Sequence, residues 1–497
     1  MKKNFVSILF IVPILLMTSC TKGFLDVNKN PNAATDVPPK VLLSSSTVGI
    51  GFVNSNELGK IAALLMQYNS GIAGLSASYD QWNIASLDNQ WSNELYNPTA
   101  TNLGILIQKT QGTSPFYSGI GKLELAYLIS IATDLWGDVP YSQAAQGLND
   151  NGSPKFAQPV FDAQSDIYLG NQSKGIKSLF NLVREGIADV NAAASVLRPA
   201  GDDMVYGGNM SKWNRFGNSL LLKLALQVSN KAPDTTKAVI RDIVSNNKPI
   251  IDALDGSLDF KVPFNSANPN AYYLQDIGGS IPNTEMLSSR FLALERSLRD
   301  SVRLSKFYSK PAATFVGYDN GSPVAAPAAS TRSVYGIYVL GYSSTGPDGS
   351  APVRLMTAFR NNFILAEYAL RFAADTTNLS TYYRNGITAS MLSTGLSQAD
   401  VNAYFAANPA VYTLSGTKDQ MLQQIITQKY VASVGNAIES YNDYRRVGYP
   451  VLTAPLTTAG DDPNTMPQRY PYTISEGTSN PNQPNPRPKT NVKVWWQ

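Results

Sequence analysis

The sequence predicts a mainly helical scaffold that carries long irregular loops, and two observations lead to this fold class. Apolar residues recur every three to four positions in several stretches, which is the periodicity of a helix with one buried face. Between these stretches lie long segments rich in Asn, Gly, Pro and Ser, which interrupt helices and favour turns. No fixed repeat period is visible, so an array of helical repeats does not follow from periodicity alone.

The apolar stripes mark the expected helices in chain order. We expect each stripe to pack in the core against neighbouring helices. The stripes are Ile120–Leu135, Ile176–Val190, Trp213–Val228, Met356–Ala373 and Met421–Val434.

The segments between the stripes are too irregular for helix and too long for tight connections. Loops longer than about 15 residues are usually functional or mobile. A short β-like run, Ser333–Leu340, is expected to form a small hairpin inside one of them. The main loop segments are 140–170, 250–285, 310–355 and 450–490.

Composition excludes several classes of function. The 497 residues include 40 basic and 36 acidic side chains, a margin too small and too scattered for a nucleic-acid-binding surface. Histidine is absent, which removes Ser-His-Asp catalysis, histidine metal sites and imidazole proton transfer. The single cysteine, Cys20, allows no intrachain disulfide and no thiolate zinc site. We expect no enzyme and no cofactor.

The first residues have the features of a sorting signal. Lys2 and Lys3 precede an apolar stretch, 5–17, which is shorter than the roughly 20 residues that span a bilayer. The stretch leads into Leu16-Met17-Thr18-Ser19-Cys20, which resembles a bacterial lipobox. We therefore expect a signal peptide over 1–19, lipidation of Cys20 and one domain over 20–497 in the cell envelope; an ordinary signal peptide with a chance cysteine is the alternative.

Four sets of motifs resemble the SusD/RagB family of outer-membrane nutrient-binding lipoproteins of Bacteroidetes, and the type 2 SusD-like subgroup in particular. They occur in the family's order along nearly the whole chain. The motifs are Phe24–Asn32 (FLDVNKNPN), Asp134–Tyr141 (DLWGDVPY), Arg360–Ala369 (RNNFILAEYA), and a C-terminal series of Gln428–Tyr430, Tyr444–Pro450 and Arg469–Tyr472.

The resemblance implies tetratricopeptide-like helix pairs (an α-α superhelix) with irregular loops and a few short β-hairpins. It also implies a lipid anchor in the outer membrane, facing the cell surface, and a SusC-like TonB-dependent β-barrel as partner. In such a system the lipoprotein captures an oligosaccharide, or sometimes a peptide, and delivers it for nutrient uptake.

Most motif residues are expected to be structural. Gly137 offers a left-handed helix end, Pro140 stops the helix, Trp136 packs under the turn and Asp138 bonds local backbone. Arg445 and Arg446, near a helix end, are expected to interact with the negative end of the helix dipole or to pair with Glu439. Glu367 is expected to pair with an arginine such as Arg360 or Arg371.

Ligand residues have to be chosen by chemistry, because the family's sugar-stacking aromatics lie outside the shared motifs. Sugars need exposed aromatic faces surrounded by amides, carboxylates or guanidinium groups. Residues 79–97 fit this need, and replacing both tryptophans there by alanine is expected to weaken binding without unfolding; burial in the core is the alternative. The candidates are Tyr79, Trp82, Asn83, Trp91 and Tyr96, with a second aromatic set of Tyr272, Tyr273, Tyr335, Tyr338 and Tyr342.

Other functions stay open as alternatives. The cargo could be a peptide, and a purely structural envelope protein would show no transporter partner. A glycosidase needs two carboxylates and no histidine, and the pairs Asp202/Asp203 and Asp461/Asp462 are its candidates. The turn segments 149–152 and 255–257 lack a complete calcium-loop pattern, so a structural calcium ion is only an alternative.

Overall fold

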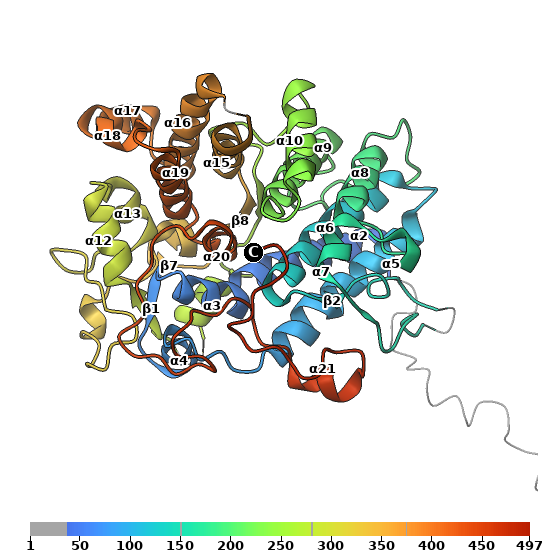
Figure 1. Cartoon of the computed structure of the whole chain (residues 1–497), viewed down its shortest axis with the longest axis horizontal. Coiled ribbons are helices and arrows are strands. Elements are labelled where there is room, and N and C mark those ends of the chain that lie inside the picture. Colours follow the sequence, from blue (N-terminus) through green and yellow to red (C-terminus); the bar gives the residue numbers. More distant parts are fainter. Residues whose placement is uncertain (1–36, 150–151, 280–281, 374) are drawn as a thin grey trace, which may run out of the picture. The chain divides into compact units, whose positions relative to one another are not determined.

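Helices dominate the part of the chain that the structure describes (Figure 1). The computed structural model describes residues 37–149, 152–279, 282–373 and 375–497. The expected signal peptide, Cys20 and the Phe24–Asn32 motif lie outside the described residues. Residues 39–497 form one unit, which is the subject of everything below.

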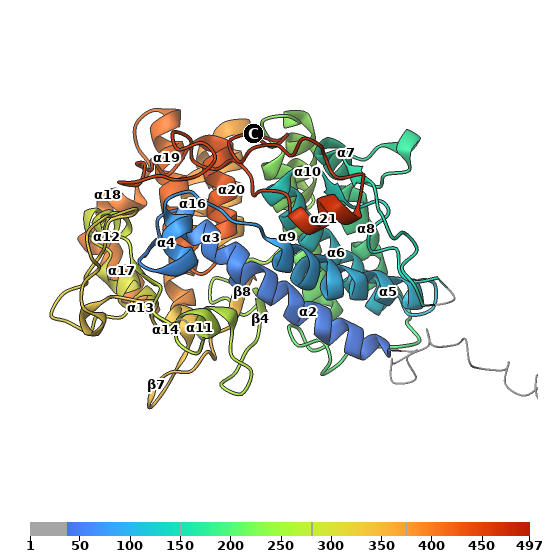
Figure 2. The same ribbon diagram turned by 90° about the horizontal axis from the view of Figure 1, so that it is seen from below.

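Among the N-terminal helices, α2, η1 and α5 pack against α6, which is buried along almost its whole length. Every residue of α6 from Phe116 to Trp136 is buried except Lys122, so the helix is covered on all sides and not only along the expected stripe. Figure 2 shows α2 and α3 following each other end to end across the molecule. The bounds are α2 (Pro39–Ser55), α3 (Glu57–Leu65), α4 (Gly74–Asp80), η1 (Gln90–Ala100), α5 (Thr101–Thr110) and α6 (Pro115–Trp136).

A row of packed helices follows in the middle and C-terminal parts of the chain. Helix α6 packs against α8, α8 against α9, α9 against α10 and α15, and α15 against α16 and α19. The bounds are α7 (Gln164–Leu169), α8 (Leu179–Val190), α9 (Met210–Gln227), α10 (Pro233–Ser245), α15 (Ala358–Tyr368), η4 (Ala369–Ala373), α16 (Thr376–Ser393), α17 (Gln398–Ala407), α18 (Pro409–Tyr412), α19 (Lys418–Ala432) and α20 (Ala437–Val447). The predicted helical fold class is confirmed.

Side-chain caps start several of these helices where the sequence offers a hydroxyl or amide. Ser397 with Asp400 and Thr417 with Gln420 form complete capping boxes at α17 and α19. At the other end of α20, Gly448 adopts a left-handed conformation (φ 79°), which ends the helix. Local sequence therefore sets these boundaries.

Short elements occupy the loop regions between the long helices. The bounds are η2 (Gln172–Lys174), α11 (Ala271–Asp276), α12 (Ser289–Ser297), α13 (Ser301–Phe307), η3 (Ala329–Thr331), α14 (Ile337–Leu340) and α21 (Ile474–Ser479). The expected hairpin at Ser333–Leu340 was wrong, because α14 takes up the end of this run and a hairpin starts only at Tyr342.

In the described residues, four antiparallel two-stranded sheets hold the loops together. Only β6 and β7, among the described strands, form a tight hairpin; β1 pairs with β5 and β4 with β8 across long stretches of sequence. The pairs are β1 (Asn69–Gly71) with β5 (Glu285–Leu287), β2 (Val139–Pro140) with β3 (Phe161–Asp162), β4 (Phe260–Val262) with β8 (Val353–Met356), and β6 (Tyr342–Ser343) with β7 (Gly346–Pro347).

The end of α6 meets the C-terminal segment. Gly137 follows the helix with φ 89°, and the Trp136 indole N–H donates to the carbonyl oxygen of Pro471 at 2.9 Å. The carboxylate of Asp138 accepts the backbone N–H of Gln164 at 2.8 Å, so its partner is backbone, as expected, but lies 26 residues away and is not local. Two motifs that are far apart in the sequence, 134–141 and 469–472, thus form one structural joint.

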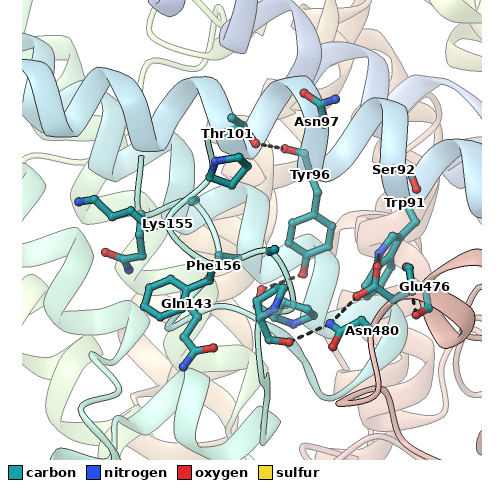
Figure 3. Close-up of a pocket in the computed structure, with 18 of the residues that line it drawn as sticks. Trp91, Ser92, Tyr96, Asn97, Thr101, Gln143, Lys155, Phe156, Glu476 and Asn480 are labelled. Carbon is teal, nitrogen blue, oxygen red and sulfur yellow. Dashed lines mark hydrogen bonds between the residues drawn. The ribbon is translucent and has the colours of Figure 1, made fainter. Parts of the chain in front are cut away.

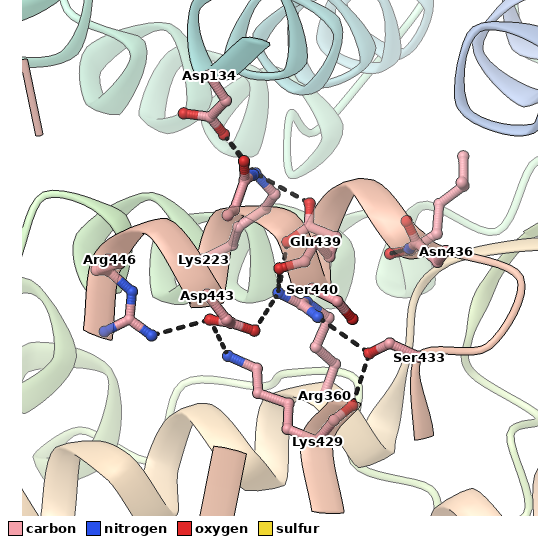
Figure 4. A network of polar contacts seen from close by, with 12 residues as sticks. Asp134, Lys223, Arg360, Lys429, Ser433, Asn436, Glu439, Ser440, Asp443 and Arg446 are labelled. Carbon is pink, nitrogen blue, oxygen red and sulfur yellow. Dashed lines mark hydrogen bonds and ion pairs between the residues drawn. The ribbon is translucent and has the colours of Figure 1, made fainter. Parts of the chain in front are cut away.

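A buried network of charges joins α6, α9, α15, α19 and α20 (Figure 4). Glu439 pairs with Arg360 at 2.6 Å and with Lys223 at 3.2 Å, and all three side chains are at most 4% exposed. Asp443 accepts from Lys429 at 2.9 Å and from Arg360 at 3.2 Å. Buried ions need such compensation, since their desolvation costs several kcal/mol each.

The expected pair of Glu367 with Arg371 is confirmed, and Arg445 and Arg446 lie in the last turn of α20, where the helix dipole is negative. The alternative in which one of these two arginines pairs with Glu439 was wrong. Glu367 does pair with Arg371, at 2.6 Å, but its second partner is Arg446 and not Arg360. Glu439 lies on α20 with Arg446, yet its cationic partners come from α15 and α9. Arg445 lies over the ring of Tyr441 instead, 3.9 Å from its centroid.

Candidate functional site

A pocket of about 280 Å³ opens where three segments distant in the sequence meet (Figure 3). The first is η1 with the start of α5, the second is the loop after β2, and the third is α21. The lining residues are Trp91, Ser92, Tyr96, Asn97, Thr101, Pro140, 143–147, Pro154, Lys155, Phe156, Ala157, Pro159, Glu476, Ser479 and Asn480.

Three aromatic side chains contribute to the pocket, and they differ in exposure. Phe156 is 43% exposed, Tyr96 is half-buried and Trp91 is only 2% exposed. Trp91 lies in a cluster of rings: its ring centroid is 5.2 Å from that of Trp136 and 6.0 Å from that of Phe161. Most of its surface is therefore already covered. Phe156 therefore offers the most accessible ring surface in the pocket.

The hydroxyl of Tyr96 is fixed by the chain on the other wall. It donates to the carbonyl oxygen of Pro140 at 2.8 Å. Burial raises the pKa of Tyr96 well above its ordinary value, with the charge of Glu476 acting in the same direction, so the hydroxyl stays protonated. The Tyr96 ring is thus held in place as a wall of the pocket.

Amide groups surround the aromatic surface. The Gln143 side-chain oxygen accepts the backbone N–H of Val160 at 3.0 Å, which leaves its NH₂ group as a donor. Asn480 donates to the carbonyl oxygen of Pro159 and to Glu476, both at 2.8 Å, and its side-chain oxygen accepts the backbone N–H of Asn482 at 3.1 Å, which leaves one lone pair of that oxygen as an acceptor. The exposed Asn97 adds a further amide at the rim.

The described lining of the pocket carries one negative and one positive side chain, Glu476 and Lys155, and the negative one is already hydrogen-bonded. Glu476 accepts from the Trp91 indole N–H at 3.3 Å and from Asn480, so both of its oxygens are engaged. Lys155 is exposed on the opposite loop, and no ion pair within the described ranges involves it. The pocket therefore combines aromatic surface, several amides and one accessible cation.

The five residues selected by composition do not share one site. Trp91 and Tyr96 line the pocket, whereas Tyr79, Trp82 and Asn83 do not. Tyr79 is 2% and Trp82 is 7% exposed, and Asn83 is exposed beside them. The candidate stretch thus contains both core residues and pocket residues.

The second aromatic set is mostly buried. Tyr272, Tyr335 and Tyr338 are at most 6% exposed, and the rings of Tyr272 and Tyr335 pack edge to face at 5.7 Å. Tyr342 is exposed on β6 and Tyr273 is half-buried; neither lines this pocket.

Composition missed the residues that the loops bring into the pocket, among them Gln143, Lys155, Phe156 and Asn480. The available signal was loop length, since segments 140–170 and 450–490 were both expected to be functional or mobile. Phe156 lies between Pro154 and Pro159, where helix is disfavoured and an apolar side chain has no stripe to join.

The carboxylate pairs of the glycosidase alternative are engaged in structural bonds. Asp203 accepts the backbone N–H groups of Tyr206 and Gly208 and the indole N–H of Trp213, at 2.7 to 3.0 Å. Asp461 accepts the backbone N–H of Thr490 at 2.9 Å. Both pairs fasten loops and neither lines the pocket.

Two further features concern metals and membranes. Within the described ranges, no group of three or more acidic or cysteine side chains lies close enough to hold a metal ion. In the same ranges, no helix combines the length and the hydrophobicity that crossing a bilayer requires.

A family model described as "Starch-binding associating with outer membrane" matches residues 31–473, which is most of the chain. The chain belongs to the SusD-like family. The predicted resemblance, including the type 2 subgroup, is therefore confirmed, and membership assigns this SusD-like protein a nutrient-binding role. No curated protein matches the sequence.

Solved structures share the fold. A chitin-binding SusD homologue from Flavobacterium johnsoniae is similar with a TM-score of 0.74 at 20% identity, over 92% of this chain and 98% of that one. A SusD homologue from Bacteroides uniformis gives 0.70 at 22% identity, over 92% and 99% of the two chains. One from Bacteroides fragilis gives 0.71 at 21% identity, over 93% and 100%.

Proposed function

We propose that this SusD-like protein is a cell-surface lipoprotein that binds an oligosaccharide in the pocket around Phe156 and delivers it to a SusC-like TonB-dependent transporter. The observation that carries the proposal is an exposed aromatic ring surrounded by amide groups with free donors and acceptors. The C–H face of a sugar ring packs on an aromatic face, while its hydroxyls need directional hydrogen-bond partners.

Different pocket residues would stack on the sugar ring and hydrogen-bond its hydroxyls. Phe156 would supply the stacking surface, with Tyr96 as a fixed wall. Asn97 and the free NH₂ group of Gln143 would bond the hydroxyls, with the remaining lone pair of the Asn480 oxygen as a further acceptor. The similar chitin-binding protein from Flavobacterium johnsoniae agrees with a glycan as ligand.

The same residues argue for binding without catalysis. Retaining and inverting glycosidases need two carboxyl groups about 5 to 10 Å apart across the scissile bond. Glu476 is the one acidic side chain among the described lining residues, and both of its oxygens are occupied by Trp91 and Asn480. We therefore propose capture and not hydrolysis.

The anchor and the domain organisation belong to the same proposal. Lipidation of Cys20 after removal of 1–19 would hold a single domain, 20–497, at the outer membrane. Durable attachment takes two or more acyl chains, because one chain binds only weakly. Cys20→Ala is expected to move the protein from the membrane fraction to the soluble fraction, and co-purification of a TonB-dependent transporter would test the partner.

Titration calorimetry with chitohexaose, maltoheptaose and a mixed peptide pool tests the ligand class. We expect one of the glycans to bind, and Phe156→Ala and Asn97→Ala each to weaken that binding by about tenfold. Tyr342→Ala, which removes an exposed aromatic outside the pocket, is the matched control and should leave affinity unchanged. Binding of peptides alone would favour a peptide cargo, and glycan affinity unchanged in both pocket variants would overturn the proposed site.

A further inference from the structure

A second pocket, of about 350 Å³, lies on the helical scaffold between α10, the α15–η4 segment and α16. Helices α10 and α15 stand beside each other in Figure 1. This second pocket shares no residue with the first, and its walls come from long helices instead of loops. Its buried floor is Leu365 and Ala369, and its walls include Lys237, Arg241, Tyr368, Phe372, Asp375 and Tyr382.

Three half-buried aromatic rings line the second pocket. The rings of Tyr368 and Phe372 lie one helical turn apart at 25° to each other, with centroids 6.1 Å apart. The Arg371 guanidinium lies 4.9 Å from the Phe372 ring centroid and is itself bonded to the buried Glu367 at 2.6 Å. Arg371, which is fixed by its ion pair with the buried Glu367, therefore holds the Phe372 ring in place, so this aromatic wall is preorganised for a ligand.

Two cations stand one turn apart on α10 at the mouth of this pocket. Arg241 is exposed, and it has neither an ion pair nor a side-chain hydrogen bond with any described residue. Within the described part of the chain Lys237 forms an ion pair with Asp234 at 3.4 Å, and the Asp234 side chain is 96% exposed, so this pair is weak. Both cations are free to bind an anion.

The one carboxylate among the described residues of the wall offsets only one of these two charges, and its oxygens are already hydrogen-bonded. Asp375 caps α16: one oxygen accepts the backbone N–H groups of Thr377 and Asn378, and the other accepts the Asn378 amide at 2.7 Å. The pocket thus carries two cations against one engaged anion, next to aromatic faces and the hydroxyls of Tyr368 and Tyr382.

We propose that the second pocket binds a carboxylate-bearing saccharide, a uronic-acid oligosaccharide in chemical class. The C–H face of the sugar ring would pack on the rings of Tyr368 and Phe372. The carboxylate would accept two parallel hydrogen bonds from the guanidinium group of Arg241. A carboxylate suits the site better than a phosphate dianion, because the excess of positive charge is only one. This proposal does not depend on the ligand of the first pocket.

Calorimetry with tetragalacturonate on the mature protein tests the proposal. We expect binding that weakens by about tenfold in Arg241→Gln and by several-fold in Tyr382→Ala, and that falls as salt is raised. Arg384→Gln is the matched control, since Arg384 is an exposed arginine on α16 outside the pocket lining. Circular dichroism and the melting temperature check that each variant is folded.

Phe156→Ala separates the two pockets. It should leave tetragalacturonate binding unchanged while it weakens binding of a neutral glycan, and Arg241→Gln should do the reverse. Three results would overturn the second site: no binding of tetragalacturonate at about 10 mM, equal binding in wild type and Arg241→Gln, or loss of binding in Phe156→Ala alone. The first two results leave capture of neutral glycans by the first pocket unaffected, and the third would place tetragalacturonate in the first pocket.

Discussion

Arg446 and Glu367 form a buried two-point ion pair across 79 residues of sequence, with the guanidinium Nη2 2.7 Å from Oε2 and its Nη1 bonded to Oε1. Both side chains are at most 1% exposed. Burial alone would raise the pKa of Glu367, but Arg446 and Arg371 hold it below its ordinary value. The pair connects α15 with α20, and therefore two of the family motifs that the sequence shows far apart.

Removing one partner of this pair is expected to be costly. Glu367→Ala leaves the buried Arg446 with Asp443 as its remaining carboxylate and removes the carboxylate that Arg371 binds, which should reduce the free energy of unfolding by about 3 to 5 kcal/mol. Urea denaturation measures the loss. Lys177→Ala breaks a pair whose side chains are 48% and 41% exposed and should cost less than about 1 kcal/mol; equal losses in the two variants would contradict the prediction.

Stability is expected to depend on pH through Glu124 on α6. Burial raises the pKa of Glu124 to about 8, although Thr47 donates to it at 2.7 Å. The unfolded chain releases this proton near the ordinary value of 4.5, while the folded chain keeps it up to about 8. The contribution of Glu124 is thus fully present below pH 4.5 and is lost as pH rises toward 8.

Glu124→Gln isolates this effect, because the amide cannot ionise. The free energy of unfolding of the variant, relative to that of wild type, should rise by on the order of 3 kcal/mol as the pH is raised from about 5 to about 8.5, because only wild type loses the contribution of Glu124. Denaturation at both pH values measures the difference. The exposed Glu185→Gln serves as control, and a Glu124→Gln curve parallel to wild type would contradict the assignment.

Trp91→Ala is expected to destabilise the protein, and not only to weaken ligand binding as the sequence led us to expect. The ring centroid of Trp91 is 5.2 Å from that of Trp136 and 4.9 Å from that of Tyr96, so removing the ring leaves a cavity in an aromatic cluster. The expected loss is about 3 to 5 kcal/mol. Phe156→Ala, which removes an exposed ring, should change the melting temperature little; a stable Trp91→Ala would show that the cluster closes around the gap.

Gly104→Ala should disturb the first pocket without touching a ligand. A Cβ at Gly104 on α5 would lie 2.1 Å from the backbone oxygen of Ala145, which belongs to the loop that lines the pocket. The loop has to move away from α5, so glycan affinity should fall by about tenfold while helix content is retained. Gly201→Ala, where a Cβ meets open space, is the control and should bind normally.

Local sequence was sufficient for much of the scaffold. The stripe Ile120–Leu135 lies in α6, and the stripe Trp213–Val228 lies in α9 except for its last residue, which caps the helix. Capping residues such as Ser397 and Thr417 mark helix starts, because periodicity and capping depend only on near neighbours. Local sequence gave the wrong prediction for Ser333–Leu340. Its β-branched and aromatic residues favour a strand, but tertiary packing places the last four residues of this run in the helix α14.

The sequence by itself determined the helical class, the family and the kind of chemistry available: no imidazole, many amides and many aromatic rings. Only the tertiary structure decided which of those rings are reachable. Trp82 and Trp91 resemble binding residues in composition but are covered by their neighbours, whereas Phe156 is exposed among amides from three distant segments. Exposure depends on which side chains cover a residue, and those partners come from contacts between segments hundreds of residues apart.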